Sequence, residues 1–187
     1  MTLFDPPELR SERLALTPIQ ACDALVVQRV FVDDPRVTQF VAWNPLTDSL
    51  LAQRFVEREA RAWQDGEDCR GWLARLSDSG EVVGFIIARR HHDRSAEFSY
   101  VVTRAHWNRG YATEIVRTLL ARAGQDRSLL QVWAVCDAEN VASRRVLEKA
   151  GMSFDRLLPR HQKHNVAAEP RDCIRFTLHL DERRRPA

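Results

Sequence analysis

The sequence has no long apolar run, and its first residues lack the composition of an export signal. The longest apolar stretch, Val82 to Ala88, is interrupted by Gly84 and is far shorter than the roughly 20 residues of a membrane-spanning helix. Pro6, Pro7 and acidic side chains occupy the start, where a signal peptide has a basic end and an apolar core. We therefore expect no membrane segment, no membrane partner and no export.

Cysteine is scarce, and neither sign of charge dominates. The 4 cysteines, Cys22, Cys69, Cys136 and Cys173, form no C-x-x-C pair, which argues against a zinc site and against a disulfide framework. The chain has 28 basic and 26 acidic residues, so a net charge of +2 gives little attraction to nucleic acid. The basic cluster Arg183–Arg185 is interpreted as a solvated terminus. We expect a cytoplasmic protein with no metal and no nucleic-acid partner.

The sequence also lacks internal repeats, low-complexity segments and Gly/Ser linkers, so no feature marks a domain boundary. We expect one domain over residues 1–187 with its core at about 9–180. Residue periodicity predicts an α+β (α/β layered) fold, with a mixed, mostly antiparallel sheet flanked by helices. The predicted strands are 13–16, 72–76, 82–90, 96–102, 129–136 and 171–180; the predicted helices are 20–30, 47–63, 111–123 and 141–150; an irregular loop is expected at 159–170.

The most informative stretch is W-N-R-G-Y-A-T-E at 107–114, between a predicted strand and an amphipathic helix. Gly110 lets backbone N–H groups approach a ligand, and the free amides of the helix's first turn form an anion site suited to a pyrophosphate. Arg109 adds a cationic group. From these residues alone a second interpretation stays open, in which Gly110 only permits a tight turn and Asn108 only caps the helix.

This stretch resembles the acetyl-CoA pyrophosphate loop of the GNAT superfamily, whose pattern is Q/R-x-x-G-x-G/A, in the form that begins with Trp. That form is typical of the branch that includes ribosomal-protein alanine N-acetyltransferases. Three further stretches resemble the same branch in the same order: L-R-S-E-R-L at 9–14, A-E-F-S-Y at 96–100, and N-V-A-S at 140–143 followed by E-K-A-G-M at 148–152. The resemblance implies the GNAT acyl-CoA N-acyltransferase fold.

The resemblance also implies acetyl-CoA as the cosubstrate. In that fold the fourth and fifth strands, here 97–102 and 129–136, splay apart, and the pantetheine arm lies in the gap. Backbone N–H groups near Val101 would hold the thioester carbonyl and stabilise the oxyanion. The implied cofactor-binding residues are Val101, Val102, Asn108, Arg109, Gly110, Tyr111, Ala112, Thr113, Asn140 and Ser143.

Glu97 and Ser143 are the candidate catalytic residues. Glu97 falls where many relatives carry a glutamate that accepts the proton of the amine; the alternative is a solvent-facing strand residue. Leu147 stands where many relatives have the tyrosine that protonates the leaving thiolate, so Ser143 would face the sulfur instead, as a serine does in some relatives. Asn140 resembles the asparagine that contacts pantetheine, and it also fits an ordinary N-cap. Glu114 is explained by the helix dipole alone.

The acceptor side is less informative. Phe40 and Trp43 lie between two predicted helices, in a region that often lines the acceptor pocket of the family, and core packing is the alternative. His91 and His92 are expected to be solvated loop residues. The loop at 159–170 has a length typical of loops that cover a site.

The resemblance thus implies an N-acetyltransferase that moves the acetyl group of acetyl-CoA to a primary amine by direct attack in a ternary complex. The acceptor is a peptide N-terminus or a small-molecule amine, and the chain is a monomer or a homodimer. A non-catalytic acyl-CoA-binding or sensing module stays open because of Leu147. A nucleic-acid-binding protein that uses the arginine-rich tail is poorly supported by the near-neutral charge.

Overall fold

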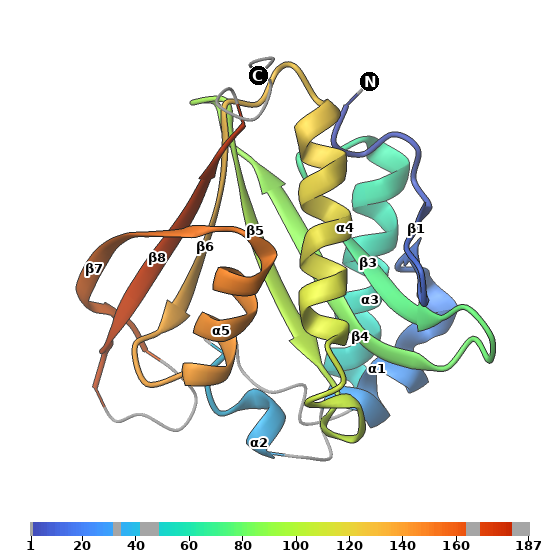
Figure 1. Cartoon of the computed structure of the whole chain (residues 1–187). Coiled ribbons are helices and arrows are strands. Elements are labelled where there is room, and N and C mark those ends of the chain that lie inside the picture. Colours follow the sequence, from blue (N-terminus) through green and yellow to red (C-terminus); the bar gives the residue numbers. More distant parts are fainter. Residues whose placement is uncertain (1, 32–34, 42–48, 164–168, 181–187) are drawn as a thin grey trace.

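The structure is a computed structural model that describes residues 2–31, 35–41, 49–163 and 169–180. These residues form one sheet of 8 strands with helices on both faces (Figure 1). The strands are β1 Leu9–Arg10, β2 Leu14–Pro18, β3 Cys69–Leu76, β4 Val82–Arg90, β5 Ser95–Val102, β6 Gln131–Asp137, β7 Ser153–Gln162 and β8 Arg171–His179. The helices are α1 Ala24–Phe31, α2 Pro35–Thr38, α3 Ser49–Asp65, α4 Tyr111–Gln125 and α5 Val141–Ala150, with short 3-10 turns at Ala21–Asp23 and Arg104–His106.

The strand order across the sheet is β1-β2-β3-β4-β5-β6-β8-β7. Every neighbouring pair is antiparallel except β5 and β6, which run parallel because α4 connects them as a crossover. In Figure 1, α4 and α5 cover one face of the sheet, and α1 and α3 cover the other. The predicted mixed, mostly antiparallel sheet flanked by helices is confirmed.

The alternation of side chains along each strand builds an apolar core on each face of the sheet. On β3, Trp72 belongs to the core under α4 and α5, whereas its neighbour Leu73 belongs to the core under α1 and α3. Phe98 is buried in the first core and Phe85 in the second. Burial of each such side chain contributes about 1.5–3 kcal/mol, so both helical layers are held by the sheet.

The two parallel strands in the middle of the sheet stay together for only part of their length. β5 pairs with β6 only at residues 95–97 and 131–133, although β5 continues to Val102 and β6 to Asp137. Beyond Glu97 the two strands diverge. The divergence leaves a slot in the centre of the sheet, with β5 on one side and β6 on the other.

The hydrogen-bond register decides which backbone groups of β5 face this slot. His91 donates its N–H to the carbonyl of Ser95, and Thr103 donates its N–H to the carbonyl of Val83, so the odd-numbered residues of β5 direct their backbone groups at β4. The even-numbered residues therefore direct theirs at β6 and the slot. Past the paired segment, the N–H groups of Tyr100 and Val102 face the slot.

One predicted segment was wrong. Residues 159–170 were expected to form an irregular loop, but β7 runs through Gln162 and pairs with β8. β7 is an edge strand, and an edge strand tolerates Pro159 because its missing N–H takes nothing from an inner ladder. Arg160 has a positive φ of 46°, and the register shifts between Leu158 and Gln162. Residues 164–168 lie outside the described part of the chain.

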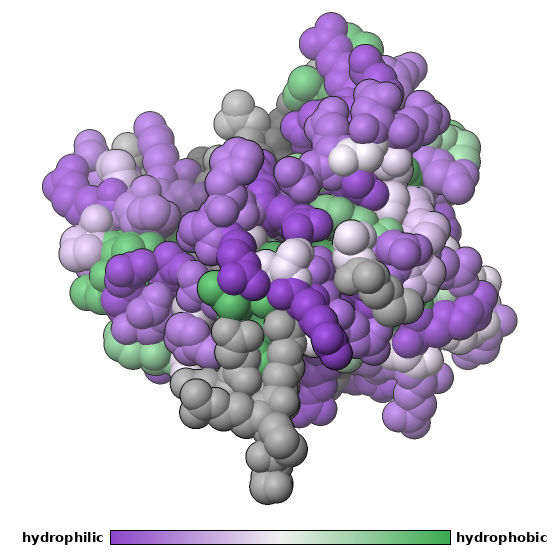
Figure 2. All heavy atoms as spheres, turned by 90° about the horizontal axis from the view of Figure 1, so that it is seen from above, coloured by the Kyte–Doolittle hydropathy of each residue, from purple (hydrophilic) through white to green (hydrophobic). Residues whose placement is uncertain are grey.

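The remaining differences are small. The helix predicted at 20–30 begins as a 3-10 turn and continues as α1, and the helix predicted at 47–63 is described from Ser49. β1 and α2 were not predicted because each contains only a few residues. Within the described residues, no helix is long and apolar enough to span a bilayer, and the face of the molecule in Figure 2 is mainly hydrophilic.

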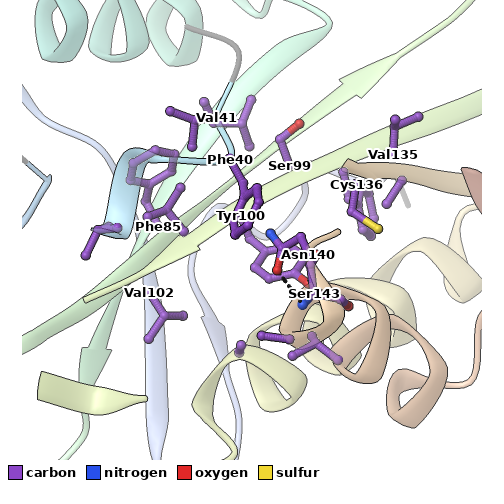
Figure 3. A pocket seen from close by; sticks show the side chains of 18 of the residues that line it. Phe40, Val41, Phe85, Ser99, Tyr100, Val102, Val135, Cys136, Asn140 and Ser143 are labelled. Atoms are coloured by element: carbon purple, nitrogen blue, oxygen red, sulfur yellow. Dashed lines mark hydrogen bonds between the residues drawn. The ribbon is translucent and has the colours of Figure 1, made fainter. Parts of the chain in front are cut away.

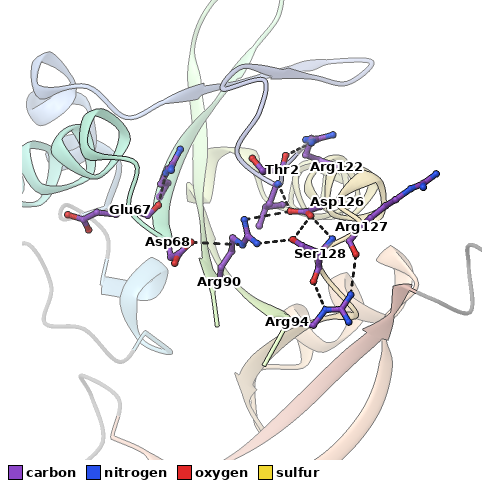
Figure 4. Close-up of polar contacts among 11 residues, drawn as sticks. Thr2, Glu67, Asp68, Arg90, Arg94, Arg122, Asp126, Arg127 and Ser128 are labelled. Atoms are coloured by element: carbon purple, nitrogen blue, oxygen red, sulfur yellow. Dashed lines mark hydrogen bonds and ion pairs between the residues drawn. The ribbon is translucent and has the colours of Figure 1, made fainter. Parts of the chain in front are cut away.

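A polar network around Asp126 fastens the N-terminal segment to the loop between α4 and β6 (Figure 4). The Asp126 carboxylate accepts the N–H of Leu3 at 2.7 Å and both the N–H and the hydroxyl of Ser128 at 2.9 and 2.5 Å. Arg90 donates to the Ser128 hydroxyl at 2.8 Å, and Arg94 donates to the Ser128 carbonyl at 3.0 Å. The network joins three segments that are far apart in the sequence.

This network makes stability depend on pH. Burial alone would raise the pKa of Asp126, but the hydrogen bonds from Ser128 and Leu3 and the charge of Arg90 outweigh burial and hold the pKa below its ordinary value. A carboxyl whose pKa is depressed by folding stabilises the protein above its unfolded-state pKa of about 3.9. That contribution is lost as the pH falls through the lower, folded-state pKa.

We expect Asp126→Asn to lower the free energy of unfolding by about 1–3 kcal/mol at neutral pH, because a buried acceptor is replaced by a group with a donor in its place. The difference from the wild type should narrow as the pH falls below about 4. Urea denaturation of both proteins at several pH values measures this difference in the free energy of unfolding. Asp78→Asn, in an exposed turn, is the matched control and should change stability by less than about 0.5 kcal/mol. A difference that stays constant with pH would contradict the assignment.

Candidate active site

The turn before α4 leaves backbone N–H groups free at the end of the slot. Gly110 is the N-cap of α4 and has a φ of 81°, a left-handed conformation that favours glycine. The first helical hydrogen bond runs from the N–H of Glu114 to the carbonyl of Gly110. The N–H groups of Tyr111, Ala112 and Thr113 precede that bond and have no acceptor within the helix. Together with the positive end of the helix dipole they form an anion site.

A clamp from the start of β2 holds this turn in place. The Glu114 carboxylate accepts hydrogen bonds from the Ser11 hydroxyl at 2.8 Å and from the Arg13 N–H and Nε at 2.9 and 2.8 Å. Arg13 also donates to the carbonyl of Arg109 at 3.1 Å and lies over the Tyr111 ring at 4.4 Å. Glu114 was attributed to the helix dipole alone; its partners show that it also ties α4 to β2.

The electrostatics of Glu114 agree with this role. Burial would raise its pKa, but hydrogen bonds from Ser11 and Arg13 and the Arg13 charge outweigh burial and hold the pKa below its ordinary value. The carboxylate in turn raises the pKa of Arg13. The stretch at 9–14 was singled out by its resemblance to a family, with no structural role given to it. The ion pair between Arg13 and Glu114 gives this stretch a role in holding the turn before α4.

A cavity of about 1280 Å³ connects the turn, the slot and the face of the sheet that carries α3. It brings together most of the residues that the sequence singled out: Phe40, Glu97, Val101, Val102, Asn108, Gly110, Tyr111, Ala112, Thr113, Asn140 and Ser143. Arg109 is not among the described residues that line it, and Trp43 lies outside the described residues. Figure 3 shows Asn140 and Ser143 of α5 close to Tyr100 of β5 within this pocket.

The start of α5 lines one side of the slot. Asn140 is the N-cap of α5, and its side-chain oxygen accepts the N–H of Ser143 at 3.0 Å. The Ser143 hydroxyl lies 2.8 Å from the hydroxyl of Tyr100. Leu147, one turn further along α5, is 1% exposed and packs in the apolar core. The leucine therefore serves packing and brings no polar group to the slot.

Glu97 lies at the point where the slot opens. It is the last residue of β5 that pairs with β6, opposite Trp133, and it faces the α3 side of the sheet. Its carboxylate is 3.6 Å from Nε2 of His91, and the His91 ring stacks on Trp133 with centroids 5.4 Å apart. His91 lies in the loop after β4, as expected, with its side chain 34% exposed, and its ring packs against both of these side chains.

The register decides which backbone groups near Val101 face the slot. Val101 pairs with Phe85 at a position of the register where its own N–H points at β4. Beyond the paired segment, the N–H groups that face the slot belong to Tyr100 and Val102. The carbonyl of Val102 already accepts the indole N–H of Trp107 at 2.8 Å. Val101 itself lines the cavity.

The arrangement combines three features: an anion site at the N-terminus of α4, a slot lined by backbone amides of β5, and the Glu97 carboxylate at the point where the slot begins. The sequence model of the acetyltransferase (GNAT) domain matches residues 13–153 of the chain. The chain belongs to the GNAT acetyltransferase family. It is therefore an acetyltransferase enzyme. Among curated proteins it is 27% identical to the uncharacterized N-acetyltransferase YoaA of Bacillus subtilis (strain 168) over 163 residues, which are 85% of this chain and 90% of YoaA.

Solved structures of acetyltransferases share this fold. RimJ of Mycobacterium smegmatis, in complex with CoA-disulfide, superposes with a TM-score of 0.82 at 21% identity over 95% of this chain and 88% of RimJ. RimL, a ribosomal L7/L12 alpha-N-protein acetyltransferase in complex with coenzyme A, superposes with a TM-score of 0.83 at 14% identity over 93% and 98% of the two chains. A GNAT acetyltransferase of Bacillus anthracis superposes with a TM-score of 0.81 at 21% identity over 93% of this chain and 99% of that protein.

The far half of the acetyltransferase's cavity, between α2, α3 and β4, has an apolar wall and charged groups. Phe40, Val41, Phe55 and Phe85 line this half, and the rings of Phe55 and Phe85 lie 5.7 Å apart. The guanidinium of Arg171 lies 5.7 Å from the centre of the Phe40 ring. Charged side chains also line it: Arg36, Arg54, Arg58, Arg89, Glu59 and Glu97.

The clamp predicts how fast the first turn of α4 exchanges its amide hydrogens. We expect Glu114→Gln to speed exchange at the start of α4 by about 10-fold, because the neutral side chain loses the ion pair with Arg13 and about 1.5 kcal/mol of local stability with it. Hydrogen exchange followed by mass spectrometry measures this change. Glu148→Gln, in an exposed pair with Arg144 on α5, is the matched control. Equal exchange at the start of α4 in wild type and Glu114→Gln would show that the clamp does not hold the turn.

Proposed function

We propose that the enzyme binds acetyl-CoA along the slot and transfers the acetyl group to a primary amine that enters from the α3 side. The observation that carries the proposal is the continuity of one cavity from the free amides at the start of α4, through the gap between β5 and β6, to the carboxylate of Glu97. An anion site, a narrow slot and a base then lie in the order in which acetyl-CoA presents its pyrophosphate, pantetheine and thioester.

The pyrophosphate is assigned to the turn. The amides of Tyr111, Ala112 and Thr113 donate to its oxygens, as the N-terminus of a helix does for anions. Asn108 and Gly110 line the same part of the cavity. Arg109 contributes through the backbone of the turn, which Arg13 holds at the Arg109 carbonyl.

The pantetheine arm is assigned to the slot, where it takes the place of a strand beside β5. The N–H groups of Tyr100 and Val102 face this space and supply donors for the arm and for the thioester carbonyl. A fixed donor at the developing oxyanion lowers the barrier of acyl transfer by about 3–4 kcal/mol. Asn140, at the start of α5, borders the arm from the other side.

Glu97 is assigned as the base. An amine is mostly protonated at neutral pH and attacks only after it loses a proton. Glu97 stands where the slot opens to the α3 side, so an acceptor from that side meets its carboxylate directly or through a water. Ser143 borders the slot near the expected position of the sulfur. The amine attacks the thioester in a ternary complex with no covalent enzyme intermediate.

The acceptor class is a peptide N-terminus or a small-molecule amine. RimL acts on the N-terminus of a ribosomal protein by its name, and the structurally similar MccE is a microcin C7 self-immunity acetyltransferase solved with acetyl-CoA and AMP. The apolar wall that includes Phe40 and Phe85 suits an acceptor with an apolar group beside its amine. A non-catalytic acyl-CoA-binding module is the second candidate, favoured by the burial of Leu147 in the core.

Calorimetric titration with acetyl-CoA, followed by thiol release against a panel of peptides and small amines, tests the proposal. Saturable binding and release of CoA with one class of amine would establish the transferase and its acceptor. Binding without release on any amine would favour the second candidate. Failure to bind acetyl-CoA would overturn both.

Gly110→Val should weaken CoA binding by about 10- to 100-fold, because a β-branched residue cannot hold the positive φ that presents the amides. Gly80→Val is the matched control: Gly80 has a φ of 74° in a hairpin turn, with nothing within 4 Å of an added Cβ. It carries the same backbone strain away from the cavity. Calorimetry of both variants separates loss of the site from loss of stability, and equal CoA affinity in Gly110→Val and wild type would sink the pyrophosphate assignment.

Glu97→Gln should reduce kcat by about 10²–10⁴-fold with little change in CoA affinity, since the amide cannot accept the proton of the amine. Steady-state kinetics across pH checks both effects. Glu57→Gln, on the exposed side of α3, is the control. A variant with the rate and profile of the wild type would remove Glu97 as the base.

A further inference from the structure

One strip of the sheet forms the floor of the cavity on the α3 side. It consists of alternate residues of two paired strands, all of which line the cavity: Phe85, Ile87 and Arg89 of β4, and Glu97, Ser99 and Val101 of β5. Each member of one set lies directly opposite a member of the other. The strip is apolar at the Phe85 end and charged at the Arg89 end, so an acceptor that lies along it meets both kinds of surface.

Arg89 and Glu97 form the charged end of the strip. Arg89 stands opposite Glu97 in the antiparallel ladder, so both side chains leave the same face of the sheet with their β-carbons about 4.5–5.5 Å apart. A contact with the Cys69 side chain and the charges of nearby carboxylates hold the pKa of Arg89 above its ordinary value, so the guanidinium stays charged. A fixed cation therefore borders the cavity beside the carboxylate assigned as the base.

The Arg89 guanidinium is accessible to a ligand. Arg89 is exposed, and within the described part of the chain no carboxylate lies within the 4.0 Å of an ion pair with it. The two carboxylates whose charges act on it have other neighbours. Glu97 lies 3.6 Å from the His91 ring nitrogen, and Glu59 accepts a hydrogen bond from Arg58 at 2.9 Å. The guanidinium thus keeps its donors for a group that enters the cavity.

The charges of this pair match those of a free amino acid. Such an acceptor carries its ammonium and its carboxylate on one carbon atom, so a cation and an anion enter the cavity together. The carboxylate of Glu97 suits the ammonium, and a guanidinium forms two parallel hydrogen bonds with a carboxylate. A peptide N-terminus has an amide carbonyl at the position of that carboxylate, which brings no charge for Arg89 to bind.

The apolar end of the strip suits the side chain of such an acceptor. Ile87 and Phe85 follow Arg89 on the same face of β4, at about 7 Å for each step of two residues. Phe40 and Phe85 line this part of the cavity (Figure 3), and the rings of Phe55 and Phe85 lie 5.7 Å apart. An apolar side chain that extends from the charged pair towards Phe85 is removed from water by these rings, which favours binding.

We propose that the acceptor is a free amino acid with an apolar side chain, whose amine lies at Glu97 and whose carboxylate is bound by Arg89. The inference rests on the proposed function and narrows its acceptor class. In the reaction the ammonium gives one proton to Glu97, and the freed amine bonds to the acetyl carbon. The C–S bond breaks with its electron pair on sulfur, and the thiolate takes the second proton of the nitrogen through water. The products are an N-acetyl amino acid and CoA.

Matched acceptors test the inference with the wild-type enzyme. The probes are leucine, methionine and phenylalanine, each beside its amide, in which only the carboxylate is replaced. The amine of the amide loses its proton more readily, so the chemistry of the amine alone favours the amide. We nevertheless expect kcat/KM, measured by thiol release, to be about 10- to 100-fold higher for at least one amino acid than for its amide, because only the carboxylate forms charge-assisted hydrogen bonds with Arg89.

Variants of Arg89 show whether this residue causes the preference. In Arg89→Gln the ratio of kcat/KM for the amino acid over its amide should fall to near 1. Arg89→Lys keeps the charge but loses the paired hydrogen bonds, so it should give an intermediate ratio. Arg61→Gln is the control, because Arg61 is an exposed residue of α3 that is not among the described residues lining the cavity, and it should keep the wild-type ratio. Calorimetry with acetyl-CoA checks that each variant retains its CoA site.

The outcomes distinguish this inference from the proposed function. If the wild type binds no acetyl-CoA, or releases no CoA with any amine, the proposed function fails and this inference fails with it. If the wild type releases CoA but uses the amides or peptides at least as well as all three amino acids, only the amino-acid assignment is overturned. A wild-type preference for the carboxylate in Arg89→Gln would also overturn it, because another group would then bind the carboxylate.

Discussion

The divergence of β5 and β6 after Glu97 is the constraint on which the rest of the molecule depends. A sheet satisfies its backbone by pairing strands, and a buried N–H without a partner costs about 1–3 kcal/mol. The sheet tolerates the slot because each bordering strand keeps one complete ladder. β5 pairs with β4 along its length, and β6 pairs with β8 from Gln131 to Asp137. The opening therefore costs the ladder bonds of the slot-facing backbone groups beyond the paired segment, on β5 from Tyr100 to Val102 and on β6 after Trp133.

Two helix N-termini meet at this opening. α4 begins at Gly110 and α5 begins at Asn140, and both starts line the same cavity. The two helices pack against each other on one face of the sheet (Figure 1). Their positive ends add to the free amides of the slot, so the polar character of the cavity comes mainly from the backbone. A site built this way depends on strand register and helix start more than on the identity of individual side chains.

Most of the fold could be predicted from the sequence because most of its helices and strands have a local sequence pattern. The apolar run in 82–90 and the Gly-bounded helices at 111–123 and 141–150 correspond to β4, α4 and α5 within one or two residues. β7 escaped because its charged residues and Pro159 look like a loop, and only its partner β8 makes it a strand. The residues of the turn could be picked out from Gly110 and its place before a helix.

The rest of the candidate site could not be predicted from the sequence, because it depends on strand register and on contacts between distant residues. Which amides near Val101 face the slot is a matter of register, and a one-residue difference would direct the other set of amides into it. The hydrogen bond between Tyr100 and Ser143 joins residues 43 positions apart, and no local sequence pattern predicts it. The stacking of the loop residue His91 on Trp133 of β6 likewise joins segments that are far apart in the sequence.

The clamp between Arg13 and Glu114 also has a consequence for the way the chain matures. Its partners are separated by 101 residues, so the turn before α4 acquires its final support only when the segment just before β2 meets a helix made much later. Closing so long a loop is entropically slow compared with forming α4 itself. During synthesis the helix can therefore exist before the turn is rigid. The turn is then completed late in folding, once β1 and β2 have packed beside α4.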